Sequence, residues 1–180
     1  TCGDGGLVVT SDERTHRRAT LLRWLGIDRA ADRVTGAYDV AEWGHNFHLN
    51  EIGAAIGAAN IDLADDVVRR HRANAAVLDD ELAGIPGLEL TERLPDCEPS
   101  CWMFPVKVDD RPAFTRRMAD AGIAASVIVR RNDAHSCVRG AAAPLPGMDA
   151  LEHRMVHLPV GWWLSEEDLA HISKTVRSGW

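Results

Sequence analysis

The histidines of this sequence include two pairs at spacings that metal sites use. His45 and His48 stand three residues apart, and His153 and His157 stand four apart. No carboxylate-bearing helix frames either pair, and Pro159 indicates that the second pair lies on a strand rather than on one helical face. We therefore expect no metal site at either pair.

Two other segments contain residue types that bind phosphate groups. The neighbours Arg130 and Arg131 either bind a diphosphate through paired hydrogen bonds or form a solvated pair in a loop. The turn Gly3-Asp4-Gly5-Gly6 has the glycines of a phosphate loop, but it lacks the GxGxxG pattern and a following Lys-Ser/Thr pair. A β-rich run follows this turn instead of a helix, so we expect no phosphate site there.

The composition is that of an ordinary globular chain. Of its 180 residues, 46% are hydrophobic and 26% are charged, so the chain is long enough to bury a core. Its 20 basic and 27 acidic residues give a net charge of -7, which argues against nucleic acid or an anionic membrane as the main partner. No apolar stretch reaches the length of a membrane span, and the N-terminus lacks the features of a signal peptide.

The cysteines indicate the redox environment. Cys2, Cys97, Cys101 and Cys137 have irregular spacing, and only Cys97 and Cys101 are close in sequence. A disulfide framework or a structural zinc site would need regular pairs. We expect reduced thiols in a cytoplasmic protein.

Caps and glycines mark the elements that must position these side chains. Ser11 or Asp12 caps a helix that Gly26 ends. Asn50 caps a second helix, and a capping box at Ser165 opens the last one. The predicted helices cover residues 13–25, 51–59, 62–83, 112–121 and those after 165, the predicted strands cover 7–10, 88–90, 102–108, 123–129 and 155–158, and residues 27–48 and 130–146 are predicted loops.

These elements predict an α/β fold of two parts that divide near residue 62. Residues 1–61 provide one strand, one helix, a long loop and a helix of small residues, which do not make a closed domain. The predicted strand has no ladder partner, so this part has the character of the end of a larger domain. Residues 62–180 alternate short strands with helices and predict a small α+β domain.

Several segments together resemble one enzyme family. Gly3-Asp4-Gly5-Gly6-Leu7-Val8-Val9-Thr10 resembles the GEGG-hydrophobic-Thr segment of the DegT/DnrJ/EryC1/StrS family. These are fold-type-I pyridoxal-phosphate (PLP) enzymes that mostly aminate nucleotide-linked keto sugars. Further matches follow in the family's order at residues 21–29, 44–57, 69–72, 122–126 with 132–135, and 158–161 before a serine-capped helix. The resemblance covers the whole chain, and its specificity comes from the shared order.

The resemblance implies that the Schiff-base lysine is not among these residues. In the family that lysine lies a few residues before the GEGG turn, so it would precede Thr1, and the chain resembles the C-terminal half of such an enzyme. Residues 1–61 would be the C-terminal remnant of the large PLP-binding domain with a dimer-interface loop, and residues 62–180 the small C-terminal domain. Lys107 and Lys174, the two lysines of this sequence, are predicted to be solvated surface charges.

The resemblance also implies roles for residues of this chain. Asn46 occupies the position of an asparagine that reaches the cofactor phosphate in the other subunit of the homodimer, and an amide donor suits a phosphate oxygen. His48 stands where arginine is more usual, so it either bonds a substrate phosphate when protonated or packs. His135 matches a histidine whose loop closes over the substrate, beside the candidate diphosphate clamp of Arg130 and Arg131.

Three functions remain open on the sequence. The first is the C-terminal half of a PLP-dependent aminotransferase for a dTDP-linked 4-keto-6-deoxy hexose, with glutamate as amino donor, working with an N-terminal half that bears the Schiff-base lysine. A related branch of the family dehydrates such sugars, and the segment that separates the branches is absent from this sequence.

The second function is an inactive interrupted-gene product, or a scaffold that dimerises through residues 27–61. The third is a module that binds a nucleotide sugar or a partner protein. Because residues 1–61 present an unpaired strand edge and a helix of small residues, we also expect a homo-oligomer.

Overall fold

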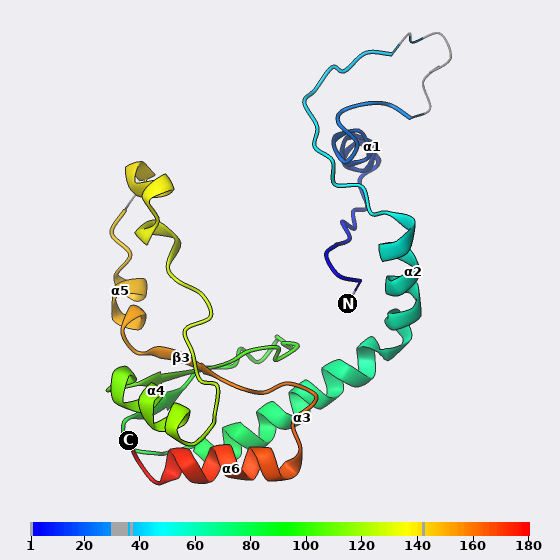
Figure 1. Cartoon of the computed structure of the whole chain (residues 1–180). Coiled ribbons are helices and arrows are strands. Elements are labelled where there is room, and N and C mark those ends of the chain that lie inside the picture. The colour runs from blue at the N-terminus through cyan, green and yellow to red at the C-terminus, as the bar shows by residue number, and fades with distance from the viewer. Residues whose placement is uncertain (1, 30–35, 37, 142) are drawn as a thin grey trace. The chain divides into compact units, whose positions relative to one another are not determined.

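The computed structural model describes residues 2–29, 36, 38–141 and 143–180, and Figure 1 shows the course of the chain. The chain divides into two units, Thr1–Leu63 and Ala64–Trp180. Part of the predicted long loop, residues 30–35 and 37, lies outside the described residues.

Helix α1 (Glu13–Leu22) opens the regular structure of the first unit and is shorter than predicted. It begins after Asp12, whose carboxylate accepts a hydrogen bond of 2.8 Å from an N–H of the first turn. The expectation that it continues to residue 25 is wrong. Leu25 and Gly26 adopt left-handed backbone angles, with φ of 56° and 76°, and these angles end the helical path.

Helix α2 (Glu51–Asn60) begins where the sequence predicts a cap. The side chain of Asn50 accepts a hydrogen bond from the Gly53 N–H at 2.8 Å. A short 3-10 turn, η1 (Ile61–Leu63), follows and completes the first unit. The cap therefore fixes where the chain changes from the preceding loop into the helix.

The strand predicted over residues 7–10 does not form. Leu7, Val8 and Val9 are 88%, 82% and 93% exposed, and none of them pairs with another part of the chain that the structure describes. A β-rich run becomes a strand only when a second strand takes up its backbone hydrogen bonds. The prediction of a strand is thus wrong here because no described segment provides that partner.

A three-stranded antiparallel sheet lies at the centre of the second unit. Its order is β1 (Leu88–Leu90), β2 (Phe104–Val108) and β3 (Met155–Leu158). In this register Val106 of the central strand lies opposite Val156 of β3. Strand β2 is shorter than the predicted strand, which began at residue 102.

Helices α3 (Ala64–Leu82), α4 (Arg111–Asp120) and α6 (Glu166–Arg177) cover one face of this sheet (Figure 1). Alternate residues of β2 point toward these helices and are buried. The core is one continuous cluster, to which the helices contribute Ala75, Leu78, Leu82, Phe114, Met118, Leu169, Ile172 and Val176. The other face of the sheet presents the polar side chains of Glu89 and Lys107.

The strand predicted over residues 123–129 does not form either. Only Ser126 pairs, in an isolated bridge to His157 of β3 with backbone hydrogen bonds of 2.9 and 3.2 Å. The residues that follow, 127–129, have exposed side chains. The apolar run does not become an interior strand because the chain leaves the sheet after this single pairing.

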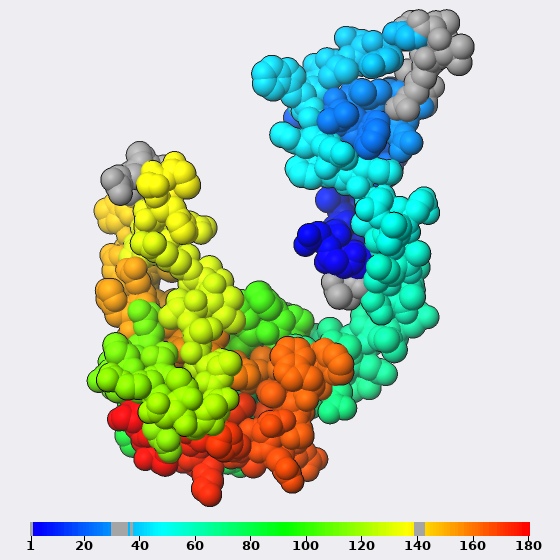
Figure 2. Space-filling model, viewed as in Figure 1, coloured from blue at the N-terminus to red at the C-terminus, as the bar shows by residue number. Residues whose placement is uncertain are grey.

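Residues 127–141 and 143–154, which we call the arm, project from the sheet and helices of the second unit (yellow to orange in Figures 1 and 2). The arm contains two 3-10 turns, η2 (Asn132–Ala134) and η3 (Ser136–Ala141), followed by helix α5 (Pro146–Glu152). The sequence predicted a loop over residues 130–146 and assigned no element to residues 147–154. The returning end of the arm leads directly into β3.

Candidate functional site

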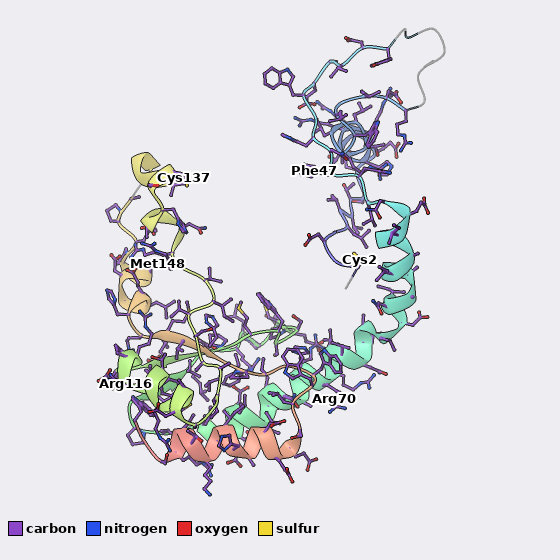
Figure 3. All side chains as sticks on the ribbon, in the orientation of Figure 1. Cys2, Phe47, Arg70, Arg116, Cys137 and Met148 are labelled. Carbon is purple, nitrogen blue, oxygen red and sulfur yellow. The ribbon has the colours of Figure 1, made fainter. Side chains whose placement is uncertain are left out.

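The loop before α2, residues 42–49, is held against the C-terminal end of α1. The His45 N–H donates to the Leu22 carbonyl at 2.9 Å, and the His45 carbonyl accepts from the Leu25 N–H at 3.1 Å. Phe47, labelled in Figure 3, donates a further bond of 3.0 Å to a carbonyl near the end of the same helix. These backbone bonds position the side chains on either side of Phe47.

Two glycines allow this close approach. A Cβ atom on Gly44 would lie 2.7 Å from the Leu22 carbonyl oxygen and closer still to the backbone of Gly26, nearer than the 3.0 Å that real Cβ atoms keep. An ion pair between Arg18 and Glu42, with Nε donating to Oε2 at 2.9 Å, fastens the start of the loop. The hydrogen bond from Arg18 holds the pKa of Glu42 below its ordinary value.

Asn46 presents an amide donor on the exposed side of this loop. Its Oδ1 accepts from the His48 backbone N–H at 3.4 Å, and its Nδ2 has no hydrogen-bond partner among the residues that the structure describes. An unpaired amide N–H is a suitable donor to a phosphate oxygen. The local geometry therefore leaves this group available.

His48 combines the two interpretations that the sequence left open, since it packs and is also exposed. Its ring meets the indole of Trp24 edge-on, with centroids 5.0 Å apart. The guanidinium of Arg29 lies 5.2 Å from the centroid of the same indole and brings a positive charge to it. Sequence reasoning gave Trp24 and Arg29 no role, although a tryptophan and an arginine within one matched segment were the available signal.

Arg130 and His135 lie on the arm with exposed side chains. His135 directly follows η2, where its N–H donates to the Asn132 carbonyl at 3.1 Å and its carbonyl accepts from the Val138 N–H at 3.1 Å. Figure 3 labels Cys137 in the same part of the arm. Neither the guanidinium of Arg130 nor the imidazole of His135 has a partner within the described ranges.

Arg131 turns into the arm and meets three carboxylates. Its Nε and Nη2 donate to Asp133 at 2.6 Å, and its Nη1 donates to Asp149 at 2.6 Å and to Glu152 at 3.0 Å. Its side chain is only 12% exposed. These bonds raise the pKa of Arg131 and hold the pKa of Asp133 below its ordinary value. Unlike its neighbour Arg130, Arg131 is engaged within the arm.

The ion pair of Arg131 with Asp133 predicts an arm that is sensitive to acid. Because the folded-state pKa of Asp133 lies below its ordinary value of 3.8, the pair adds stability above that value and loses it as the pH falls through the lower folded-state pKa. We expect the NMR amide signals of Ala134 and His135 to change in that range before the signal of Val106 in the core. Simultaneous loss of both sets of signals would contradict this expectation.

The predicted site residues fall into two groups, one in each unit. Asn46 and His48 share the loop of residues 42–49, and Arg130, Arg131 and His135 share the arm. Within each group the residues are also close in sequence, no more than five residues apart.

The two lysines of the chain have surroundings unlike those of a Schiff-base lysine, which needs a desolvated pocket. Lys107 of β2 forms an ion pair with Glu89 of β1, and this hydrogen bond lowers the pKa of Glu89. Lys174 is exposed on α6.

The described residues contain no group of three or more His, Cys, Asp or Glu that could hold a metal ion. The Nδ1 atom of His157 instead lies 3.2 Å from the carbonyl oxygen of Ser126, the residue before the arm. All four cysteines are free thiols. Within the described ranges, the structure has no helix of the length and apolar character that a membrane crossing requires.

The scaffold of helices and a sheet carries exposed polar side chains on the loop of residues 42–49 and on the arm, and the two lysines of the chain lie outside both segments. The chain belongs to the DegT/DnrJ/EryC1/StrS aminotransferase family, whose model matches residues 1–177. The enzymes of this family depend on pyridoxal phosphate. The predicted family and cofactor are thereby confirmed.

Similar proteins of known structure and sequence support this assignment. The chain superposes on the sugar aminotransferase CalS13 from Micromonospora echinospora with a TM-score of 0.96 and 60% identity, over 100% of this chain and 49% of that one. It is 28% identical over 181 residues to the erythromycin biosynthesis sensory transduction protein EryC1 of Saccharopolyspora erythraea, covering 98% of this chain and 48% of that protein.

A second relative in sequence is the dTDP-3-amino-3,4,6-trideoxy-alpha-D-glucose transaminase of Streptomyces venezuelae. It is 27% identical over 179 residues, which are 97% of this chain and 45% of that protein. The chain thus spans about half the length of the curated relatives it matches. The predicted fold class, part of a fold-type-I PLP-dependent transferase, is confirmed by the structural match.

Proposed function

We propose that this chain is the substrate-contacting, C-terminal half of a PLP-dependent aminotransferase that acts on a nucleotide-linked 4-keto-6-deoxy sugar of the dTDP type. Residues 1–61 belong to the large PLP-binding domain and its dimer interface, and residues 62–180 form the small C-terminal domain. An N-terminal half supplies the Schiff-base lysine, and glutamate supplies the amino group. The enzyme works as a homo-oligomer in the cytoplasm, for which the four free thiols are suited.

One observation carries the proposal: the chain offers exposed anion-binding side chains but no lysine in Schiff-base surroundings. Lys107 is paired with Glu89, and Lys174 is exposed. The donors of Asn46 and Arg130 have no partners in the described part of the chain. Such a chain can bind and orient anionic groups, while the covalent chemistry requires a lysine from another polypeptide segment.

The residues fit pyridoxal phosphate at its phosphate group. When bound, the cofactor supplies the electron sink through which an amino group is transferred. The unpaired Nδ2 of Asn46 would donate to a phosphate oxygen of the cofactor in the neighbouring subunit. His48, when protonated, would add a positive charge for a substrate phosphate beside Arg29 and the Trp24 indole.

The arm supplies the remaining substrate contacts in this proposal. Arg130 can donate two parallel hydrogen bonds to a diphosphate, because its exposed guanidinium is not used elsewhere among the described residues. His135 carries an exposed imidazole that can hold or donate a proton toward the substrate. Both residues orient the substrate through hydrogen bonds and form no covalent bond with it.

Incubation with pyridoxal phosphate tests whether the Schiff-base lysine must come from an N-terminal half. We expect the chain alone to develop no Schiff-base absorption, because the Lys107 ammonium is held in an ion pair with Glu89 and Lys174 is exposed to solvent. Mixed with a lysine-bearing N-terminal half of a family member, it should develop this absorption and transaminate a dTDP-linked keto sugar with glutamate. Variants Lys107→Ala and Lys174→Ala should leave both results unchanged.

Two outcomes would overturn the proposal. Absorption and transamination that stay absent with the matched half would favour an inactive scaffold. Tight binding of a nucleotide sugar by the chain alone, without activity in the mixture, would favour a binding module.

The sugar carbon that receives the amino group is tested by comparing two keto sugars as substrates. The name of the Streptomyces venezuelae relative places an amino group at carbon 3 of its sugar. The assay therefore offers dTDP-linked deoxy sugars with the keto group at carbon 3 or at carbon 4. The proposal expects faster turnover of the 4-keto sugar, and a preference for the 3-keto sugar would correct the substrate class.

A further inference from the structure

We propose that Arg131 is a positioning residue that joins the two limbs of the arm, the outgoing limb with η2 and the returning limb with α5, and thereby places His135, rather than a direct contact to a substrate diphosphate. The part of this inference that concerns His135 rests on the proposed function. The part that concerns the arm rests on the geometry of its ion pairs.

The carboxylates that surround Arg131 come from both limbs of the arm. Asp133 lies two residues further along the outgoing limb, within η2. Asp149 and Glu152 lie on α5 of the returning limb, 18 and 21 residues beyond Arg131. One planar guanidinium with four hydrogen bonds therefore connects the segments on either side of His135.

The returning limb is in turn attached to the body of the second unit. Arg111, the first residue of α4, donates to the backbone carbonyl of Glu152 and, at 3.3 Å, to that of Met155. At the outgoing limb, the His157 side chain lies against the Ser126 carbonyl. Hydrogen bonds thus hold both ends of the arm to the body of the second unit. The contacts of Arg131 add a connection between η2 and α5, further from that body.

Charge also argues against a diphosphate at Arg131. The single guanidinium of Arg131 faces the three carboxylates of Asp133, Asp149 and Glu152, so the cluster has a net negative charge. A diphosphate would have to displace these carboxylates and approach their like charges. Arg130 carries no such neighbours in the described ranges and is exposed, so it is the better diphosphate ligand of the pair.

Adjacent arginines with different surroundings make a matched test on the full chain. Hydrogen exchange of the arm amides of Ala134, His135 and Val138 should become about tenfold or more faster in Arg131→Ala, because the limbs are no longer joined. Exchange should change by less than about twofold in Arg130→Ala. In Arg131→Lys, a single charged donor should restore part of the protection.

The core amide of Val106 distinguishes positioning from general stabilisation. It should keep its exchange rate in every variant, because the core lies outside the arm. Arm exchange that stays within about twofold of wild type in Arg131→Ala would overturn the proposal. An equal acceleration of Val106 and the arm would overturn it as well.

A double-mutant cycle in the enzyme completed with a lysine-bearing half tests the link to His135. If Arg131 acts through His135, then Arg131→Ala should slow turnover in the wild-type background but add little to His135→Ala. A full additional loss in the double variant would show direct substrate contact and overturn the proposal. An inactive wild-type mixture would refute the proposed function, and the exchange experiment would still decide whether Arg131 orders the arm.

Discussion

Replacing Phe114 by alanine is expected to lower the free energy of unfolding of the second unit by about 3–5 kcal/mol. Phe114 of α4 is completely buried, and its ring meets Trp180 edge-on with centroids 4.9 Å apart. The substitution removes a large apolar side chain and leaves a cavity that the surrounding sheet and helices close only in part. Chemical denaturation followed by far-ultraviolet circular dichroism measures the loss.

Phe47→Ala is the matched control, because it makes the same substitution at an exposed side chain. Phe47 is 72% exposed, so its truncation should change stability by no more than about 0.5 kcal/mol. A loss below about 1 kcal/mol at Phe114 would contradict the core described here. Equal losses for the two variants would contradict it too.

The second large effect is expected at Gly44. A Cβ atom there would lie 2.7 Å from the Leu22 carbonyl oxygen, so Gly44→Ala must push the loop of residues 42–49 away from α1. We expect a cost of about 1–3 kcal/mol, typical of overpacking. The hydrogen bonds that His45 makes with the end of α1 should then break, which makes amide exchange at His45 and Phe47 roughly 5- to 150-fold faster.

Gly6→Ala controls for the loss of a glycine in the same unit. A Cβ atom on Gly6 meets nothing within 4 Å, and Gly6 has no left-handed φ. Its substitution should leave exchange at His45 and Phe47 unchanged. Unchanged exchange in Gly44→Ala would show that the loop tolerates the added carbon, and it would remove the steric basis for the placement of Asn46.

Local signals account for the parts of the fold that the sequence predicted well. The caps Asp12, Asn50 and Ser165 act on amides three residues away, so their side chains identify helix starts without knowledge of the rest of the chain. The strands over 88–90 and 155–158 were confirmed with the predicted bounds.

Pairing over long distances explains what the sequence left open or predicted wrongly. The runs at 7–10 and 123–129 have strand-forming residues, but a strand exists only with a neighbour. Arg131 was equally compatible with a diphosphate clamp and a solvated loop, because its partners Asp149 and Glu152 lie 18 and 21 residues away. The close contact of Gly44 with Gly26 also joins residues that are distant in sequence, and neither glycine alone predicts it.

The exposed run Leu7–Val9 bears on how this chain would associate with a partner that supplies a strand. The core of the second unit is closed by side chains between Ala75 and Val176, so that unit has the contacts it needs to fold early. In the described part of the chain, Leu7–Val9 have exposed apolar side chains and no paired strand, and a strand that paired with them would remove these side chains from water. If that strand comes from a separate polypeptide, the two chains must first meet in solution. The rate at which the strands pair then rises with the concentration of the partner.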